Sequence, residues 1–148
     1  MTIIDFHIHP VQVQELRDRD PELDRSVRDI FGLYMKPQPL ATLMLHRDAA
    51  GVDKAVMLPI DASSAHGGTI VSNQQIAWLM EQSDRLIGFA SVDPNLPDAA
   101  AALRRDVRAY GLKGLKLDPA LQQFAINDRE RAYPVYAAAV ELGIPILI

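Results

Sequence analysis

Two of the four histidines in this chain stand on alternate positions of one short apolar run, IIDFHIHP, at residues 3–10. Residues two apart on a β-strand point to the same face, and their Cα atoms lie about 6.5 Å apart. The imidazole rings of His7 and His9 can therefore converge on one divalent cation, which each ring nitrogen would bind at about 2.0–2.1 Å. The alternative for each ring is a buried histidine that hydrogen-bonds neighbouring carbonyl groups, but two rings on one face favour a metal.

The strand around the histidine pair determines what else can reach such a cation. Alternation predicts that Asp5 shares the face of His7 and His9, and that the apolar residues of the strand pack under helices on the other face. These apolar residues are Ile4, Phe6 and Ile8. Because Pro10 ends the run, His9 stands at the C-terminal end of its strand, where barrel enzymes place their chemistry.

The composition excludes several other chemistries. The 148 residues include no cysteine, so disulfides, thiolate metal ligands and a cysteine nucleophile are excluded, and nitrogen and oxygen must hold any metal. The net charge of −4 arises from interspersed signs, so neither a nucleic-acid partner nor a membrane partner is expected. The chain shows neither a signal-peptide pattern nor about 18 consecutive uncharged apolar residues, and we predict a cytoplasmic protein.

Five apolar runs predict β-strands, and four segments between them predict helices. The strands are expected at residues 2–8, 52–60, 85–93, 112–119 and 144–148, and the helices at residues 40–50, 71–82, 96–111 and 128–143. Strand and helix alternate in units of about thirty residues, which predicts parallel strands joined by right-handed helical crossovers.

Two α/β architectures fit this order, a (β/α)8 barrel and an open doubly wound sheet. No G-x-G-x-x-G follows the first strand and no G-x-x-x-x-G-K-[ST] occurs, so nucleotide-binding open sheets lose their main support. We predict a TIM-barrel-type (β/α)8 fold of which this chain supplies about the first half, strands one to five. Since such a barrel needs about 200–250 residues, we expect residues 1–148 to be the N-terminal part of one larger barrel domain, or to need a partner copy for stability.

The region 11–39 is long for a connection between a strand and a helix. It contains a helical fragment, PELDRSVRDIFGLY, in which Leu23, Val27 and Ile30 form an apolar stripe. Long connections of this kind are usually lids or binding elements. Because the region directly follows the histidine pair, we predict an insertion that caps the substrate, and a disordered tether is the alternative.

Other candidate residues stand at the ends of the later strands. Lys116 and Asp118 share a strand face with Gly114 near the end of the fourth strand, and both are predicted to be catalytic. Because a buried ammonium group without a partner costs several kcal/mol, we expect Lys116 to face the substrate or to pair with Asp118. The carboxylates of Asp61, Asp93 and Asp118 are also suited to capping the loops that follow them, and capping is the favoured role for each.

Two histidines outside the first strand differ in their surroundings. His66 lies in the loop DASSAHGGT after the second strand, beside Gly67 and Gly68, which could let the loop move over a substrate. We predict a substrate-binding role for His66, with an exposed loop histidine as the alternative. His46, between charged residues of a predicted helix, is expected on the surface.

Three stretches of the chain resemble one family of enzymes. DFHIHP, RLIGFASVDP and GLKGLKLDP, at the first, third and fourth strands, resemble the amidohydrolase-related (amidohydrolase 2) group of the metal-dependent hydrolase superfamily, similar to aminocarboxymuconate-semialdehyde decarboxylase and its relatives. The resemblance covers the whole chain and the first half of such a domain. It implies a distorted (β/α)8 barrel in which His7 and His9 bind a divalent metal, most commonly Zn²⁺, with Mn²⁺ as an alternative. The further histidine and aspartate ligands of the family lie beyond Ile148.

The resemblance implies a metal-dependent hydrolase or a carboxy-lyase. The expected substrate is a small-molecule amide, lactone, ester or carboxylate, which is hydrolysed or, for an unsaturated or aromatic carboxylic acid, decarboxylated. A homodimer is compatible with this interpretation. The first alternative is a phosphoesterase of the polymerase-and-histidinol-phosphatase (PHP) type or a TatD-type nuclease, which would carry histidine or glutamate ligands on strands two to four. The second alternative is a non-catalytic half-barrel interaction module.

Overall fold

The computed structural model describes the backbone of residues 1–148 and every side chain except that of Phe31. Among these residues, the parallel strands are β1 (Ile4–Ile8), β2 (Lys54–Met57), β5 (Leu86–Gly88), β6 (Leu115–Lys116) and β7 (Ile146–Leu147). β2 lies between β1 and β5, β6 pairs with β7, and a bridge between Ala90 and Leu115 joins the two groups. The predicted α/β class with parallel strands is confirmed, although each strand is shorter than its apolar run.

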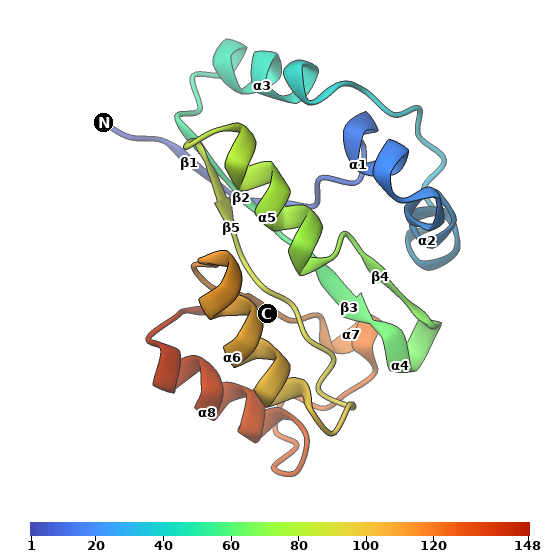
Figure 1. Ribbon diagram of the computed structural model, residues 1–148, viewed down its shortest axis with the longest axis vertical. Coiled ribbons are helices and arrows are strands. Elements are labelled where there is room, and N and C mark those ends of the chain that lie inside the picture. Colours follow the sequence, from blue (N-terminus) through green and yellow to red (C-terminus); the bar gives the residue numbers. More distant parts are fainter.

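The helices between these strands follow the predicted segments (Figure 1). They are α3 (Leu40–Ala49), α5 (Asn73–Gln82), α6 (Ala99–Tyr110) and α8 (Ala132–Leu142). Ser72 caps α5, because its side chain accepts a hydrogen bond from the Gln75 N–H while the Gln75 side chain accepts one from the Ser72 N–H. Pro134 is tolerated because it lies in the first turn of α8, where the backbone N–H has no partner within the helix. Among the helices of the described residues, none is long and apolar enough to cross a lipid bilayer.

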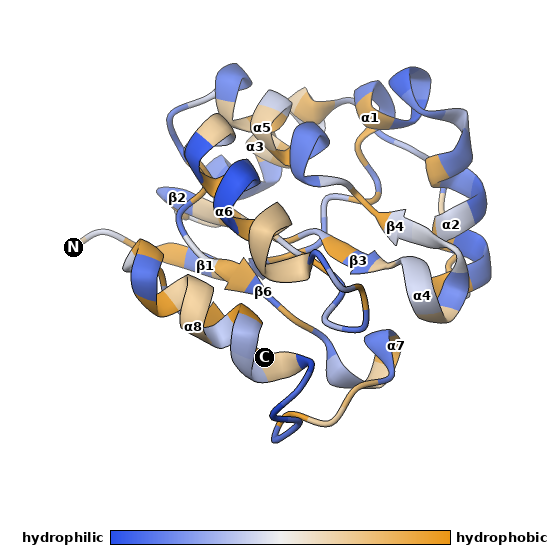
Figure 2. Cartoon of the chain, turned by 60° about the horizontal axis from the view of Figure 1, so that its bottom comes forward, coloured by the Kyte–Doolittle hydropathy of each residue, from blue (hydrophilic) through white to orange (hydrophobic). Residues whose placement is uncertain are grey.

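The sheet carries apolar side chains on both faces, and Figure 2 shows hydrophobic residues along its strands. Alternate residues of β2 belong to different clusters, as the period of two in a strand requires. The larger cluster packs against the helices and includes Ala55, Met57, Leu79, Leu103 and Leu115. The smaller cluster, on the opposite face, consists of Val56, Leu58 and Phe89, with Ile87 and Leu147 packed against it.

β1 contains a β-bulge, which changes the faces that its residues occupy. Asp5 and Ile8 pair with residues of β2 that are only two positions apart, so Phe6 and His7 both lie opposite Val56. A bulge places two residues opposite one and breaks the simple alternation of the strand. Asp5 and Ile8 therefore face the helices, while Phe6 and His7 are turned toward the opposite face.

The bulge overturns part of the predicted arrangement of β1. Asp5 does not share the face of the histidine pair, and Phe6 does not pack under the helices. Phe6 is 49% exposed, and its ring makes an edge contact with the ring of Phe89, with the two centroids 5.6 Å apart. Ile8 is buried in the helix-side cluster as expected, whereas Ile4 is exposed.

The predicted second strand and the loop after it are divided differently in the structure. Since Pro59 has no N–H for a strand ladder, β2 ends at Met57. The chain then forms an antiparallel hairpin of β3 (Ile60–Ala62) and β4 (Gly68–Ile70), with α4 (Ser63–His66) between the two strands. The predicted mobile loop is therefore a paired hairpin, in which Gly67 ends α4 with φ of 72°.

The region 11–39 is folded against the rest of the chain. It forms α1 (Gln14–Arg19) and α2 (Pro21–Phe31), and α2 packs against β4. Leu23 and Val27 of the predicted stripe are buried, and the helix ends where Gly32 adopts a left-handed conformation. A bridge between Val13 and Gln38 closes the region on itself. The alternative of a disordered tether is therefore not supported.

Candidate active site

The rings of His7 and His9 converge at the C-terminal end of β1. Their Nε2 atoms lie 3.2 Å apart, and the planes of the rings are inclined by 68°. Two ring nitrogens that bind one cation tetrahedrally at about 2.0–2.1 Å are separated by about 3.3–3.4 Å. The observed separation is therefore close to what a shared divalent cation requires, before any rearrangement of the rings.

The orientation of His9 is fixed by the neighbouring strand. Its Nδ1 lies 2.9 Å from the carbonyl oxygen of Leu58, and because a carbonyl can only accept, Nδ1 carries the proton. In the neutral ring, Nε2 then presents its lone pair toward His7. A histidine that binds a metal commonly donates its second N–H to a carbonyl or carboxylate in this way. The donor set therefore fits a metal site.

The surroundings of His9 also favour the neutral ring that a cation needs. Burial lowers the pKa of His9 below its ordinary value of 6.5, and the positive charges of His7 and Lys116 lower it further. The hydrogen bond to Leu58 and the carboxylate of Asp118 act in the opposite direction. The net effect on the pKa of His9 is downward, so the ring is predominantly neutral at pH 7.

Lys116 on β6 and Asp118, two residues farther along the chain, lie within electrostatic reach of His9. Lys116 is only 3% exposed, and burial lowers the pKa of its ammonium group while Asp118 counteracts this effect. Asp118 also accepts a hydrogen bond at 3.0 Å from the Leu121 N–H and so caps α7 (Pro119–Gln122). The predicted capping role of Asp118 is confirmed by this contact.

Asp61 and Asp93 also hold loops at this edge of the sheet. Asp61 accepts hydrogen bonds from the N–H and hydroxyl of Ser63. Asp93 is buried, and its two oxygens accept from the backbone N–H groups of Ser64 and Asn95 at 2.8 and 3.0 Å. Both carboxylates therefore have the capping role that their positions predict.

A buried glutamine at the same edge is not apparent from the sequence. The Gln122 side chain donates to the carbonyl oxygens of Asp61 and Val92 at 2.7 and 2.8 Å and accepts from the Asp118 N–H at 2.8 Å. It thus joins the ends of three strands. The adjacent Gln123 is exposed, and no pattern in the sequence distinguishes the two glutamines.

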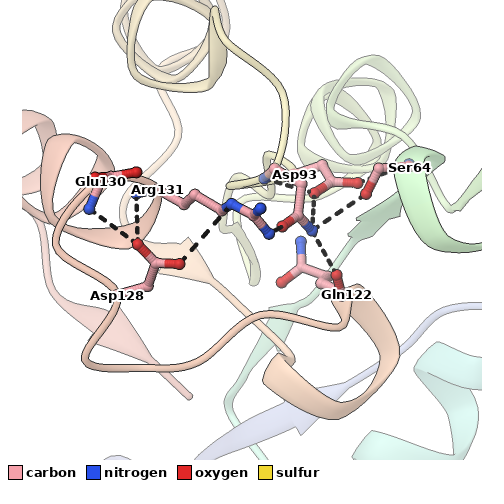
Figure 3. Close-up of polar contacts among 7 residues, drawn as sticks. Ser64, Asp93, Gln122, Asp128, Glu130 and Arg131 are labelled. Carbon is pink, nitrogen blue, oxygen red and sulfur yellow. Dashed lines mark hydrogen bonds and ion pairs between the residues drawn. The ribbon is translucent and has the colours of Figure 1, made fainter.

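An amide network extends from this glutamine across the surface of the site, as Figure 3 shows for Ser64, Asp93, Gln122 and Arg131. Asn95 is at its centre: its Nδ2 donates to Ser64 Oγ, to Asp93 Oδ1 and to the Gln122 carbonyl oxygen. Arg131 donates to the Asn95 side-chain oxygen at 3.1 Å. The loops after three strands are therefore tied together by direct hydrogen bonds.

The remaining predicted residues lie farther out. His66 is exposed at the end of α4, which packs against α7, so its substrate role stays a prediction. His46 is exposed on α3, as expected. Within the described residues, no group of three or more His, Cys, Asp or Glu side chains could hold a metal ion. His7 and His9 therefore stand as a pair, because Asp5 faces the helices and is ion-paired with Arg47.

Replacing Lys116 with methionine is expected to raise the free energy of unfolding by about 1–2 kcal/mol, because the ammonium group is buried at a cost that an apolar side chain of similar volume avoids. Since burial lowers the folded-state pKa of Lys116 below its ordinary value of 10.5, this cost is largest where the pH lies below that lowered pKa. It disappears as the pH rises through the folded-state pKa toward 10.5. Thermal unfolding of Lys116→Met from pH 7 to pH 10 tests this, with the exposed Lys113→Met as control. A methionine variant less stable than the parent at pH 7 would contradict it.

Comparisons with known proteins relate this site to a family. The family model described as amidohydrolase matches residues 4–148. No curated protein matches the chain. An uncharacterised Tim-barrel protein from Bordetella bronchiseptica is 22% identical, with a TM-score of 0.68 over 99% of this chain and 54% of that one. The 4-oxalomesaconate hydratase of Rhodopseudomonas palustris is 21% identical, with a TM-score of 0.70 over 99% of this chain and 52% of the hydratase.

A third solved structure is the 5-carboxyvanillate decarboxylase of Novosphingobium aromaticivorans, with bound manganese and a nitrobenzoic acid ligand. It is 23% identical, with a TM-score of 0.58 over 98% of this chain and 49% of the decarboxylase. The chain thus spans about half the length of these three proteins. Their likeness shows the fold, a TIM barrel of which this chain forms about half, and the match over residues 4–148 shows that the chain belongs to the amidohydrolase family.

Proposed function

We propose that this chain carries the first metal ligands and part of the substrate site of an amidohydrolase-family enzyme. The reaction is hydrolysis of a small amide, lactone or ester, or decarboxylation of an unsaturated or aromatic carboxylic acid. The observation that carries the proposal is the 3.2 Å approach of two Nε2 atoms while the Leu58 carbonyl holds Nδ1 of His9. His7 and His9 are the ligands that this arrangement supplies.

A divalent cation at this position would polarise a carbonyl or carboxylate oxygen and lower the pKa of water to about 7. Zn²⁺ suits two imidazoles, and Mn²⁺ is supported by the manganese in the decarboxylase of similar fold. Two histidines alone hold a cation weakly, so the full affinity of the site needs further ligands. The chain contributes the fixed orientation of the two rings.

Lys116 and Asp118 are proposed to act on the substrate beside the histidine pair. The buried ammonium of Lys116 is suited to bind and orient a substrate carboxylate or carbonyl oxygen, because a buried cation interacts strongly with an anion. Asp118 favours the charged form of Lys116. His66, at the end of α4, is proposed to contact the distal part of the substrate. Residues 11–39 are proposed to cover the site from the side of β1.

The carboxylate class of substrate is supported by two of the similar solved structures. One is a hydratase named for 4-oxalomesaconate, and the other holds 3-methoxy-4-hydroxy-5-nitrobenzoic acid. The family match favours this class of enzyme over the phosphoesterase and nuclease alternatives. The Lys116 ammonium is the group of this chain that complements an anionic substrate.

Metal analysis of the full-length protein, which carries the further ligands that the resemblance implies, tests the proposal. After equilibration with Mn²⁺ or Zn²⁺ and removal of free metal, we expect the parent protein to retain metal and a His7→Ala/His9→Ala variant to fall to background. His46→Ala is the control, because it removes an exposed histidine of α3. Equal metal content in the parent and the double variant would remove both histidines from the site and refute the proposed function.

A further inference from the structure

The bulge in β1 creates a requirement that a regular strand does not have. Phe6 and His7 together lie opposite Val56, so the parallel ladder cannot serve the backbone groups of both residues. A backbone N–H that loses its ladder partner needs another acceptor. The His7 N–H donates to Oδ1 of Asp5 at 3.3 Å. The carboxylate two residues earlier therefore supplies the acceptor at the point where the strand departs from its regular geometry.

The same carboxylate is held from the helical layer. Oδ2 of Asp5 forms an ion pair with Arg47, which lies on α3, 42 residues along the chain. The two side chains are only 33% and 24% exposed. Because the bulge turns Asp5 toward the helices and His7 to the opposite face, a contact on the outside of the sheet can control a ring on the inside.

We infer that the Asp5–Arg47 ion pair positions His7. The pair fixes the Asp5 carboxylate beneath the bulge, the carboxylate holds the His7 N–H, and the His7 ring consequently meets His9. Asp5 is thus a positioning residue: it orients His7 and is not itself one of the proposed metal ligands. The positioning of the His7 ring does not depend on the proposed function, but the expected effect on metal binding rests on it, because it takes the two rings as metal ligands.

The competing explanation is that the ion pair merely ties α3 to the sheet. The chain offers a matched pair for that role: Asp48, next to Arg47 on α3, pairs with Arg85 at 2.6 Å, and these side chains are 57% and 33% exposed. Arg85 also donates to the backbone carbonyls of Val52 and Asp53. This second ion pair anchors the same helix without touching the bulge. Its removal should therefore loosen α3 from the sheet without moving the His7 ring.

The experiment compares Asp5→Ala, Asp5→Asn, Arg47→Met and Asp48→Ala in the full-length protein. Affinity for Mn²⁺ alone is measured by calorimetry, and folding is checked by thermal unfolding. We expect Asp5→Ala and Arg47→Met to weaken Mn²⁺ binding about tenfold or more, as for other residues that orient metal ligands. Asp5→Asn keeps an acceptor for the His7 N–H and should lose less affinity. Asp48→Ala should bind Mn²⁺ as the parent does, even if its melting temperature falls.

A second measurement does not depend on metal. Crystal structures of metal-free Asp5→Asn and Arg47→Met report the separation of the two Nε2 atoms, which should exceed the parent value in Arg47→Met. Unchanged ring positions in Arg47→Met, or equal Mn²⁺ affinities for Asp5→Ala and Asp48→Ala, would overturn the positioning role. If the His7→Ala/His9→Ala variant binds Mn²⁺ like the parent, the proposed function fails, and the ring positions alone then decide the inference.

Discussion

Replacing Gln122 with leucine is expected to lower the free energy of unfolding by about 3–5 kcal/mol, because one buried and two partly buried backbone groups lose their partners at once. The Gln122 side chain is fully buried and bonds the carbonyl oxygens of Asp61 and Val92 and the N–H of Asp118. Leucine fills a similar volume but makes none of these hydrogen bonds. Chemical denaturation of the parent and the variant measures the difference.

The control for Gln122 is the adjacent position. Gln123→Leu makes the same substitution at an exposed site, where residue 123 ends α7 in a left-handed conformation, and its effect on unfolding should stay well below that of Gln122→Leu. Gln122→Glu is a second comparison, since it keeps the shape but offers no N–H to the two carbonyl oxygens. A leucine variant at position 122 that unfolds like the parent would show that water or a shift of α7 satisfies the three backbone groups.

The periodic features of the sequence predict the class of fold well. Each expected strand appears because its apolar run lies between turn residues, and each crossover helix appears because it follows a cap or ends at a glycine. The ends of the elements are less predictable. β2 stops before Pro59, and the residues after it form a hairpin rather than a loop, because antiparallel pairing of β3 and β4 satisfies their backbone groups.

The sequence predicts the part of the candidate site whose residues lie on one strand, but not the part that depends on contacts between distant segments. The spacing of His7 and His9 places both rings on one face, and the structure brings their Nε2 atoms to 3.2 Å. The same alternation fails for Asp5 and Phe6, because a bulge depends on contacts between strands and leaves no mark in the local pattern. Gln122 is hidden for a related reason: its three partners come from segments up to 61 residues away.

Replacing Gly114 with alanine is expected to lower the free energy of unfolding by about 2–3 kcal/mol, because the new methyl group overfills a packed layer. A Cβ at Gly114 would lie 2.6 Å from Cε1 of Phe89 and closer still to Cε2 and Cζ, whereas carbon atoms pack at about 3.5–4.0 Å. The Phe89 ring is buried and in edge contact with Phe6, so it has little room to turn. To make room for the methyl group, both the Phe89 ring and the backbone at residue 114 must move.

The matched control and the rescue follow from the same geometry. At Gly68, the nearest atom to an added Cβ is Ser26 Oγ at 3.3 Å, so Gly68→Ala should change stability by less than about 1 kcal/mol. If the Phe89 ring causes the strain, Phe89→Leu should offset part of the cost of Gly114→Ala, and the double variant should be more stable than the sum of the single losses predicts. Strictly additive losses would place the strain elsewhere.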